Sequence, residues 1–201
     1  RPPAAARAAI ERLGLAGREA QIAGELSGGW KQRLALGACT LPSPKLLLLD
    51  EPTAGVDPKA RREFWNEIHA LAADGLTVLV STHYMDEAER CHEIAYIAYG
   101  DLLVHGTVEH VIESAHLSTY VVSSAEGAGL AKLSEELTGK PGVDMVAPFG
   151  TSLHVSGRDA PALDAAITPY RQRKDLDWKP SEPSLEDVFI DLMGKAQDNF
   201  Q

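Results

Sequence analysis

Two short apolar runs without polar interruption stand in the first half of the chain, each ending in a polar residue. They cover residues 46–50 and 77–81. Unbroken runs of this length predict strands of a parallel sheet that is covered on both faces. The segment between them, residues 58–73, has apolar residues at helical spacing and begins with Asp57 and Pro58, a favourable cap and first position for a helix. The pattern predicts a βαβ unit and an α/β fold.

Glycine and proline residues in the rest of the first half mark the ends of further predicted elements around this unit. A helix is expected from the first residues to about Gly14, and another from about Trp30 to Leu41, where Pro42 and Pro44 prevent its continuation. After the second strand we expect a short helix over residues 85–91. Two short strands are then expected, at about 93–99 and 102–105.

The pattern changes near His116. Strand-like and helix-like segments then alternate in the order βαββαβ, the order of a ferredoxin-like α+β domain. A last helix is expected from Ser184, where Asp187 stands at the position of a capping box. We therefore predict two domains, residues 1–115 and residues 116–201.

Composition narrows the classes of function. The chain has 201 residues, 44% of them hydrophobic, and a net charge of −10. An acidic balance disfavours a nucleic-acid partner, which needs a basic surface. The two cysteines, Cys39 and Cys91, are far apart and are interpreted as core side chains. The first residue is Arg1 and no signal peptide follows, so we expect a piece of a longer protein.

The stretch Leu26 to Gly37 places Ser27, Gly28 and Gly29 at the start of a predicted helix. A helix N-terminus offers unpaired N–H groups that bind anions, and glycine allows a ligand to approach the backbone. These three residues could therefore hold a phosphate group. Taken alone, the same residues are more typical of a simple capped turn than of a phosphate site.

Three further polar side chains are expected at one edge of the predicted sheet. Asp50 ends the first strand and Glu51 follows it, while His83 comes just after the second strand. Ligands of open α/β sheets bind at this carboxyl edge. Asp50 could hold Mg²⁺, Glu51 could polarise an attacking water, and His83 could donate a hydrogen bond to a phosphate oxygen.

Together these motifs resemble the nucleotide-binding domain of ABC transporters, above all the ATPase subunits of exporters. In that resemblance residues 26–30 match the signature motif, with Trp30 where glutamine is commoner. Residues 46–50 match Walker B and residues 54–57 match the D-loop. The resemblance implies ATP and Mg²⁺ as ligands, with Glu51 and His83 catalytic, Asp50 on the metal, and nucleotide contacts from the residues Ser27, Gly28, Gly29, Trp30 and Asp57.

The phosphate-binding loop of such domains, Gly-x-x-x-x-Gly-Lys-Ser/Thr, does not occur in the sequence, and no Q-loop is identifiable. The chain thus resembles an incomplete P-loop NTPase core with a small α+β domain after it. The resemblance implies a second nucleotide-binding domain and a transmembrane permease as partners, at the cytoplasmic face of the membrane. Two alternatives stay open: a soluble ABC ATPase of translation or DNA repair, and a non-catalytic module that binds a partner.

Overall fold

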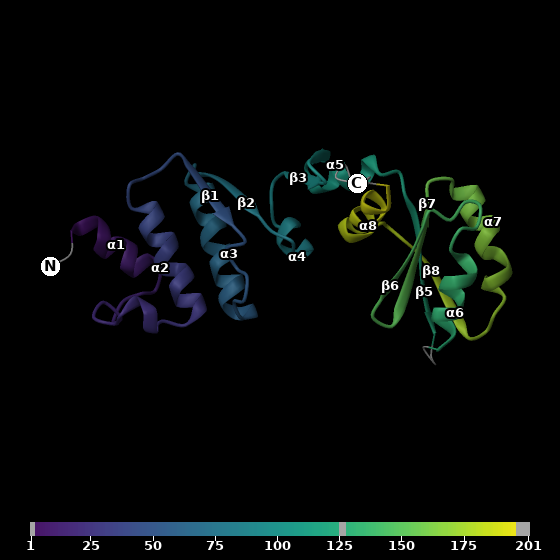
Figure 1. The fold of residues 1–201 in the computed structure, drawn as a ribbon, viewed down its shortest axis with the longest axis horizontal. Coiled ribbons are helices and arrows are strands. Elements are labelled where there is room, and N and C mark those ends of the chain that lie inside the picture. The colour runs from purple at the N-terminus through teal and green to yellow at the C-terminus, as the bar shows by residue number, and fades with distance from the viewer. Residues whose placement is uncertain (1–2, 125–127, 196–201) are drawn as a thin grey trace. The chain divides into compact units, whose positions relative to one another are not determined.

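The computed structural model describes residues 3–124 and 128–195. The chain divides into two compact units between His83 and Tyr84 (Figure 1). Each unit has its own sheet or sheets and its own buried side chains.

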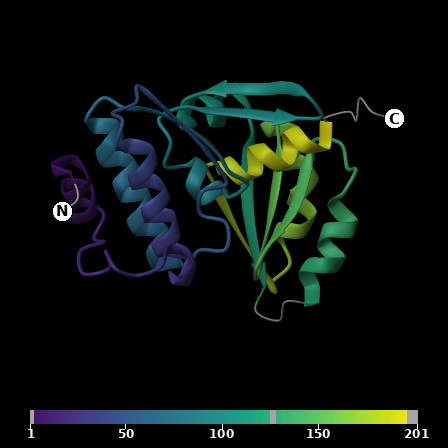
Figure 2. The ribbon, with the colours of Figure 1, turned by 60° about the vertical axis from the view of Figure 1, so that its left-hand side comes forward.

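The first unit is built around the predicted βαβ motif. Strands β1 and β2 pair in parallel, in a register that runs from Leu46 opposite Thr77 to Asp50 opposite Ser81. Helices α2 and α3 lie side by side (Figures 1 and 2), and α3 contacts β2. Both strands and α3 have the predicted bounds. The elements are α1 (Ala4–Arg12), a 3-10 turn (Ala23–Glu25), α2 (Gly28–Thr40), β1 (Leu46–Asp50), α3 (Pro58–Ala73) and β2 (Thr77–Ser81).

The prediction that these strands are covered on both faces is wrong for this chain. Leu47 is buried, whereas Leu48 is 65% exposed and Leu79 is 63% exposed. Successive side chains of a strand point to opposite faces, so the exposed leucines share the face that the helices leave uncovered. An unbroken apolar run therefore shows that both faces of a strand are apolar. It does not require that this chain itself cover both faces.

The second unit begins with a small helical and hairpin region. It contains α4 (Met85–Ala88), the antiparallel hairpin of β3 (Ile94–Ala98) and β4 (Asp101–Gly106), and α5 (Val108–Ser114). Helix α5 is not among the predicted elements. Its N-cap is Thr107, whose hydroxyl accepts a hydrogen bond from the His110 N–H at 3.2 Å.

A four-stranded antiparallel sheet follows, with its elements in the predicted order βαββαβ. The strand order across the sheet is β6-β7-β5-β8. Figure 1 shows α6 and α7 on one face of this sheet and α8 on the other. Leu133, Leu153, Leu163 and Ile167 form the centre of the core under α6 and α7. The elements are β5 (Ser118–Ser124), α6 (Ala128–Leu137), β6 (Met145–Phe149), β7 (Ser152–Gly157), α7 (Ala160–Arg171), β8 (Leu176–Ser181) and α8 (Leu185–Lys195).

Helix α8 joins the two regions of the second unit. Its residues Leu185 and Val188 are buried in one cluster with Val111, Ala115 and Leu117. Because of this cluster, the division between compact units lies about thirty residues before the predicted boundary at 115/116. A functional division at 115/116 stays a prediction, and residues 196–201 of the predicted second domain lie outside the described part of the chain.

The interpretation of both cysteines as core side chains is also wrong. Cys39 is exposed on α2, and Cys91 is partly buried after α4. The buried side of α2 is formed by Leu36 and Gly37, and position 39 lies outside that sector of the helix. Both thiols are free.

Candidate functional site

The carboxyl ends of β1 and β2 bring Asp50 and Ser81 together. These residues are opposite each other in the parallel register. The Ser81 hydroxyl donates a hydrogen bond to Oδ1 of Asp50. Asp50 is therefore held in place by the neighbouring strand, with its other carboxylate oxygen left for a further interaction.

Glu51 follows Asp50 in a backbone conformation that is rare for its residue type. Its φ is 41°, in the left-handed region that favours glycine. The Glu51 N–H donates to the carbonyl oxygen of Ser81 at 3.0 Å and lies 3.2 Å from the Ser81 hydroxyl oxygen. Sparsely populated conformations of this kind are found mainly at functional positions, where the surrounding structure maintains them.

His83 lies next to Glu51, as the predicted sheet edge requires. Its Nδ1 is 3.3 Å from Oε1 of Glu51. The two side chains are 56% and 53% exposed, respectively. Both can therefore reach a ligand outside the sheet while they remain in contact with each other.

The start of α2 is open. Ser27 is the N-cap in extended conformation, and within the described residues its side chain makes no capping hydrogen bond. Ser27 and Gly28 are exposed. The hydroxyl of Ser27 and the first N–H groups of the helix, which we call the α2 mouth (Ser27–Gly29), can thus meet an anion from outside.

The α2 mouth packs against the start of α3. A Cβ atom on Gly29 would lie 2.7 Å from the Cβ of Ala60, and one on Gly28 would lie 3.9 Å from the carbonyl oxygen of Gly55. Gly29 therefore permits close contact between two helix starts in addition to any contact with a ligand. Asp57 is engaged locally, because its Oδ1 accepts hydrogen bonds from the N–H groups of Lys59 at 3.1 Å and Ala60 at 3.0 Å.

The sequence-predicted residues thus form two groups in the first unit. Asp50, Glu51 and His83 meet at the sheet edge. The α2 mouth meets the segment that carries Asp57. Both groups are made of the residue types that bind phosphate and a hard metal ion: backbone N–H donors, hydroxyls, carboxylates and an imidazole.

Similarity to known proteins agrees with this chemistry. Residues 2–54 match the family model described as ABC transporter. The chain is 35% identical over 181 residues to the probable multidrug ABC transporter ATP-binding protein YbhF of Escherichia coli (strain K12). It is also 35% identical over 180 residues to the Nod factor export ATP-binding protein I of Rhizobium sp. (strain N33). Residues 2–54 thus belong to the ABC transporter family, and both longer matches are to ATP-binding proteins.

The chain spans only part of these ABC proteins. The first match covers 88% of the chain but 30% of YbhF, and the second covers 87% of the chain and 56% of the Nod factor export protein. Among solved structures, a nucleotide-free ATP-binding cassette of an ABC transporter is 29% identical, with a TM-score of 0.52. That match covers 55% of the chain and 44% of the cassette. The family model includes the α2 mouth, Asp50 and Glu51, whereas Asp57 and His83 lie beyond the matched residues.

No helix within residues 3–124 and 128–195 is long and apolar enough to cross a membrane.

Sequence reasoning missed Ser81 and Arg18. Ser81 was visible only as the last residue of a strand, and the parallel register is what places it on Asp50. Arg18 lies in the loop before the α2 mouth, and its guanidinium stacks on the Trp30 ring, with Cζ 4.2 Å from the ring centroid. A polar residue at the end of each paired parallel strand is the one signal that could have indicated Ser81.

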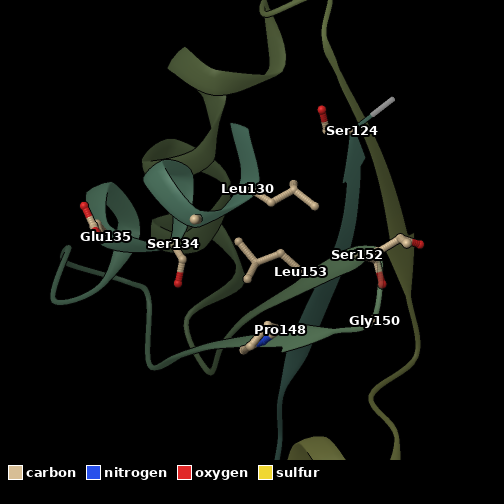
Figure 3. Close-up of a pocket in the computed structure, with 10 residues that line it drawn as sticks. Ser124, Leu130, Ser134, Glu135, Pro148, Gly150, Ser152 and Leu153 are labelled. Atoms are coloured by element: carbon tan, nitrogen blue, oxygen red, sulfur yellow. The ribbon is translucent and has the colours of Figure 1, made fainter. Parts of the chain in front are cut away.

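The second unit contains a separate open cavity, between α6 and the β6–β7 turn (Figure 3). Its volume is about 600 Å³. Leu130 and Leu153 line it together with polar groups of Ser134, Glu135 and Thr151. None of the nucleotide-site candidates lines this cavity.

Proposed function

We propose that the first unit provides the catalytic carboxylate and a phosphate-binding helix start of an ATP-hydrolysing ABC exporter subunit. The observation that carries the proposal is the convergence of Asp50, Glu51, Ser81 and His83 at one sheet edge. The match of residues 2–54 to the ABC transporter family and the similarity to ATP-binding proteins support ATP as the nucleotide.

In this proposal Glu51 acts as the general base. Its carboxylate is half-exposed and can accept a proton from a water that attacks the γ-phosphate. His83 contacts Glu51 through Nδ1, and its half-exposed imidazole is proposed to donate a hydrogen bond to a phosphate oxygen. Because the backbone of Glu51 is left-handed, its side chain points in a different direction from the one it would have if β1 continued through this residue.

Asp50 and Ser81 fit a site for Mg²⁺. A carboxylate oxygen and a hydroxyl oxygen are hard donors of the kind that this ion prefers. When bound, Mg²⁺ neutralises charge on the β- and γ-phosphates. In the chain itself, the Ser81 hydroxyl orients the Asp50 carboxylate for that task.

The α2 mouth is proposed to hold the γ-phosphate of a nucleotide that is bound mainly by a second nucleotide-binding domain. Its exposed hydroxyl and N–H groups support this assignment. Asp57 caps α3 beside the mouth. We propose that it lies at the nucleotide site while its carboxylate remains hydrogen-bonded to the backbone of α3.

The names of the relatives support the wider role. We infer that the protein works with a transmembrane permease at the cytoplasmic face of a membrane. In this role it couples the ATP-driven pairing of two nucleotide-binding domains to export. The segment from β5 to β8 is proposed to be a ferredoxin-like accessory domain. Its element order and its antiparallel strand order support that fold assignment.

The test is Glu51→Gln in the full-length protein that contains this chain. ATP should still bind, while the rate of hydrolysis should fall at least about 100-fold, the scale of a lost general base. Glu11→Gln, at an exposed position of α1, is the matched control and should hydrolyse normally. Equal phosphate release by the two variants would show that Glu51 is not the base.

A further inference from the structure

Trp30 occupies the first turn of α2, immediately after the two glycines of the α2 mouth. Its ring lies beside two cations. The Cζ atom of Arg18 is 4.2 Å from the ring centroid, and the Cζ atom of Arg33 is 5.1 Å from it. Both distances are within the range of cation–π attraction, for which tryptophan is the best partner. A glutamine, the commoner residue at this position, offers no such ring.

Arg18 belongs to a segment with little other attachment. Every residue from Ala16 to Glu25 is exposed, and the buried residues Leu15 and Leu26 stand just outside its two ends. Arg18 is itself oriented by a hydrogen bond from its Nη1 to Oε1 of Gln21 at 3.0 Å. The contact between Arg18 and Trp30 therefore joins the middle of this segment to α2.

Arg33 connects the same ring to two further parts of the unit. Its Nη1 donates a hydrogen bond to the carbonyl oxygen of Leu13 at 3.2 Å. Its Nη2 forms an ion pair with Glu63 of α3. The loop before the mouth, the end of α1 and the side of α3 are thus linked around one aromatic side chain.

We propose that Trp30 is a positioning residue, which holds residues 16–25 against α2 through Arg18 and so fixes how Ser27 is presented to a phosphate. The inference rests on the proposed phosphate-binding role of the α2 mouth. Only Leu26 lies between this segment and Ser27, and only Gly28 and Gly29 lie between Ser27 and Trp30, which is less than one helical turn. Movement of the segment therefore moves the mouth.

Amide hydrogen exchange of this chain tests the structural half. Four amides in the segment or at its end donate hydrogen bonds to carbonyl oxygens of residues 15–23 and report its order: those of Arg18, Gln21, Glu25 and Leu26. Trp30→Leu and Arg18→Gln should each accelerate their exchange by about fivefold, the scale of one cation–π contact. Trp30→Phe, which keeps an aromatic face, should restore most of the protection. Arg62→Gln, which removes an exposed arginine of α3, should change nothing.

Two results would overturn this half of the inference. One is unchanged exchange in both Trp30→Leu and Arg18→Gln. The other is equal acceleration throughout α2 and α3, because that would make Trp30 an ordinary stabilising side chain. Arg18 lies on an exposed loop, so its variant stays informative even if Trp30→Leu fails to fold.

Steady-state ATPase assays of the full-length protein test the functional half. Trp30→Leu and Arg18→Gln should raise KM for ATP about fivefold with kcat nearly unchanged, which is the signature of lost binding without lost chemistry. Trp30→Phe should recover most of the affinity. Ser27→Arg separates the two proposals. If it leaves KM unchanged, the phosphate role of the mouth is wrong; if it raises KM while the Trp30 and Arg18 variants do not, only the positioning inference is wrong.

Discussion

Ser81 shows how much of a site can depend on a residue with no conspicuous motif of its own. Its hydroxyl orients Asp50, and its carbonyl oxygen accepts the hydrogen bond of the Glu51 N–H. One residue of β2 thereby contacts the side chain of Asp50 and the backbone of Glu51 at the end of β1. If Asp50 binds Mg²⁺ as we propose, loss of such an orienting partner typically lowers metal affinity about 10–100-fold.

Ser81→Ala in the full-length protein should therefore raise the Mg²⁺ concentration needed for half-maximal ATP hydrolysis about tenfold, since Asp50 loses the partner that orients it. The measurement is ATPase activity against Mg²⁺ concentration at saturating nucleotide. Ser123→Ala, on β5 of the second unit, is the control and should leave the Mg²⁺ requirement unchanged. An unchanged requirement in Ser81→Ala would show that the hydrogen bond from Ser81 to Asp50 does not determine the affinity for Mg²⁺.

At the scale of elements, the contact between α2 and α3 depends on small residues. Gly29 and Ala60 approach so closely that an added Cβ would lie 2.7 Å from the existing one. The contact joins the start of α2, where we propose that a phosphate binds, to the helix that Asp57 caps. The two glycines of the mouth thus differ: Gly28 remains exposed, whereas Gly29 permits helix packing.

Gly29→Ala should consequently destabilise the first unit by about 1–3 kcal/mol, the usual cost of overpacking a close contact. Urea denaturation of the chain measures the change. Adding Ala60→Gly should recover part of that loss, because it removes the opposing methyl group. Gly24→Ala, where an added Cβ meets nothing within 4 Å, is the control. A Gly29→Ala variant as stable as the control would contradict the observed contact.

Helix α8 is attached to the second unit through buried charges as well as apolar side chains. Asp187 is fully buried, and its Oδ1 is 2.8 Å from Nδ1 of His154 on β7. Asp191 accepts hydrogen bonds from Arg158 at 2.6 Å and from Lys195 at 2.6 Å. A buried carboxylate needs such partners, and they make the orientation of α8 on the sheet specific.

At the scale of the whole molecule, the boundary at His83/Tyr84 makes a prediction about truncation. A chain of residues 84–201 should give a dispersed amide NMR spectrum that includes α8. A chain of residues 118–201 should keep the four-stranded sheet but lose protection in α8, because Leu185 and Val188 lose Val111 and Ala115. Equal protection of α8 in both chains would mean that the sheet alone holds this helix.

The proposed sharing of nucleotide between two domains can be tested with mixed dimers of the full-length protein. One subunit carries Ser27→Arg, and the other lacks the lysine of its phosphate-binding loop. If the α2 mouth serves the partner's nucleotide, one composite site carries both lesions and the other is intact, so ATP hydrolysis persists. If it serves its own nucleotide, each site carries one lesion. Complete loss of hydrolysis in dimers shown to form would refute sharing.

Local patterns in the sequence determined most of the elements of this chain. Strands β1 and β2 and helix α3 have the predicted bounds, because apolar periodicity and the Asp57–Pro58 start act over a few neighbouring residues. The capping box of α8 is confirmed as well: Ser184 and Asp187 exchange hydrogen bonds at 2.8 and 3.1 Å. Helix α5 was missed because seven residues carry too short a pattern to be distinguished from a loop.

Strand ends in the sequence likewise indicated Asp50, Glu51 and His83, since the carboxyl ends of paired parallel strands must meet. Only the tertiary structure determined which residues contact the site from other parts of the chain. These contacts are Ser81 with Asp50, Ala60 with Gly29 and Arg18 with Trp30. It also determined that one face of β1 and β2 is uncovered and that α8 packs with α5. These contacts join residues about twelve to eighty positions apart, and a local pattern of hydrophobic and polar positions contains no information at that separation.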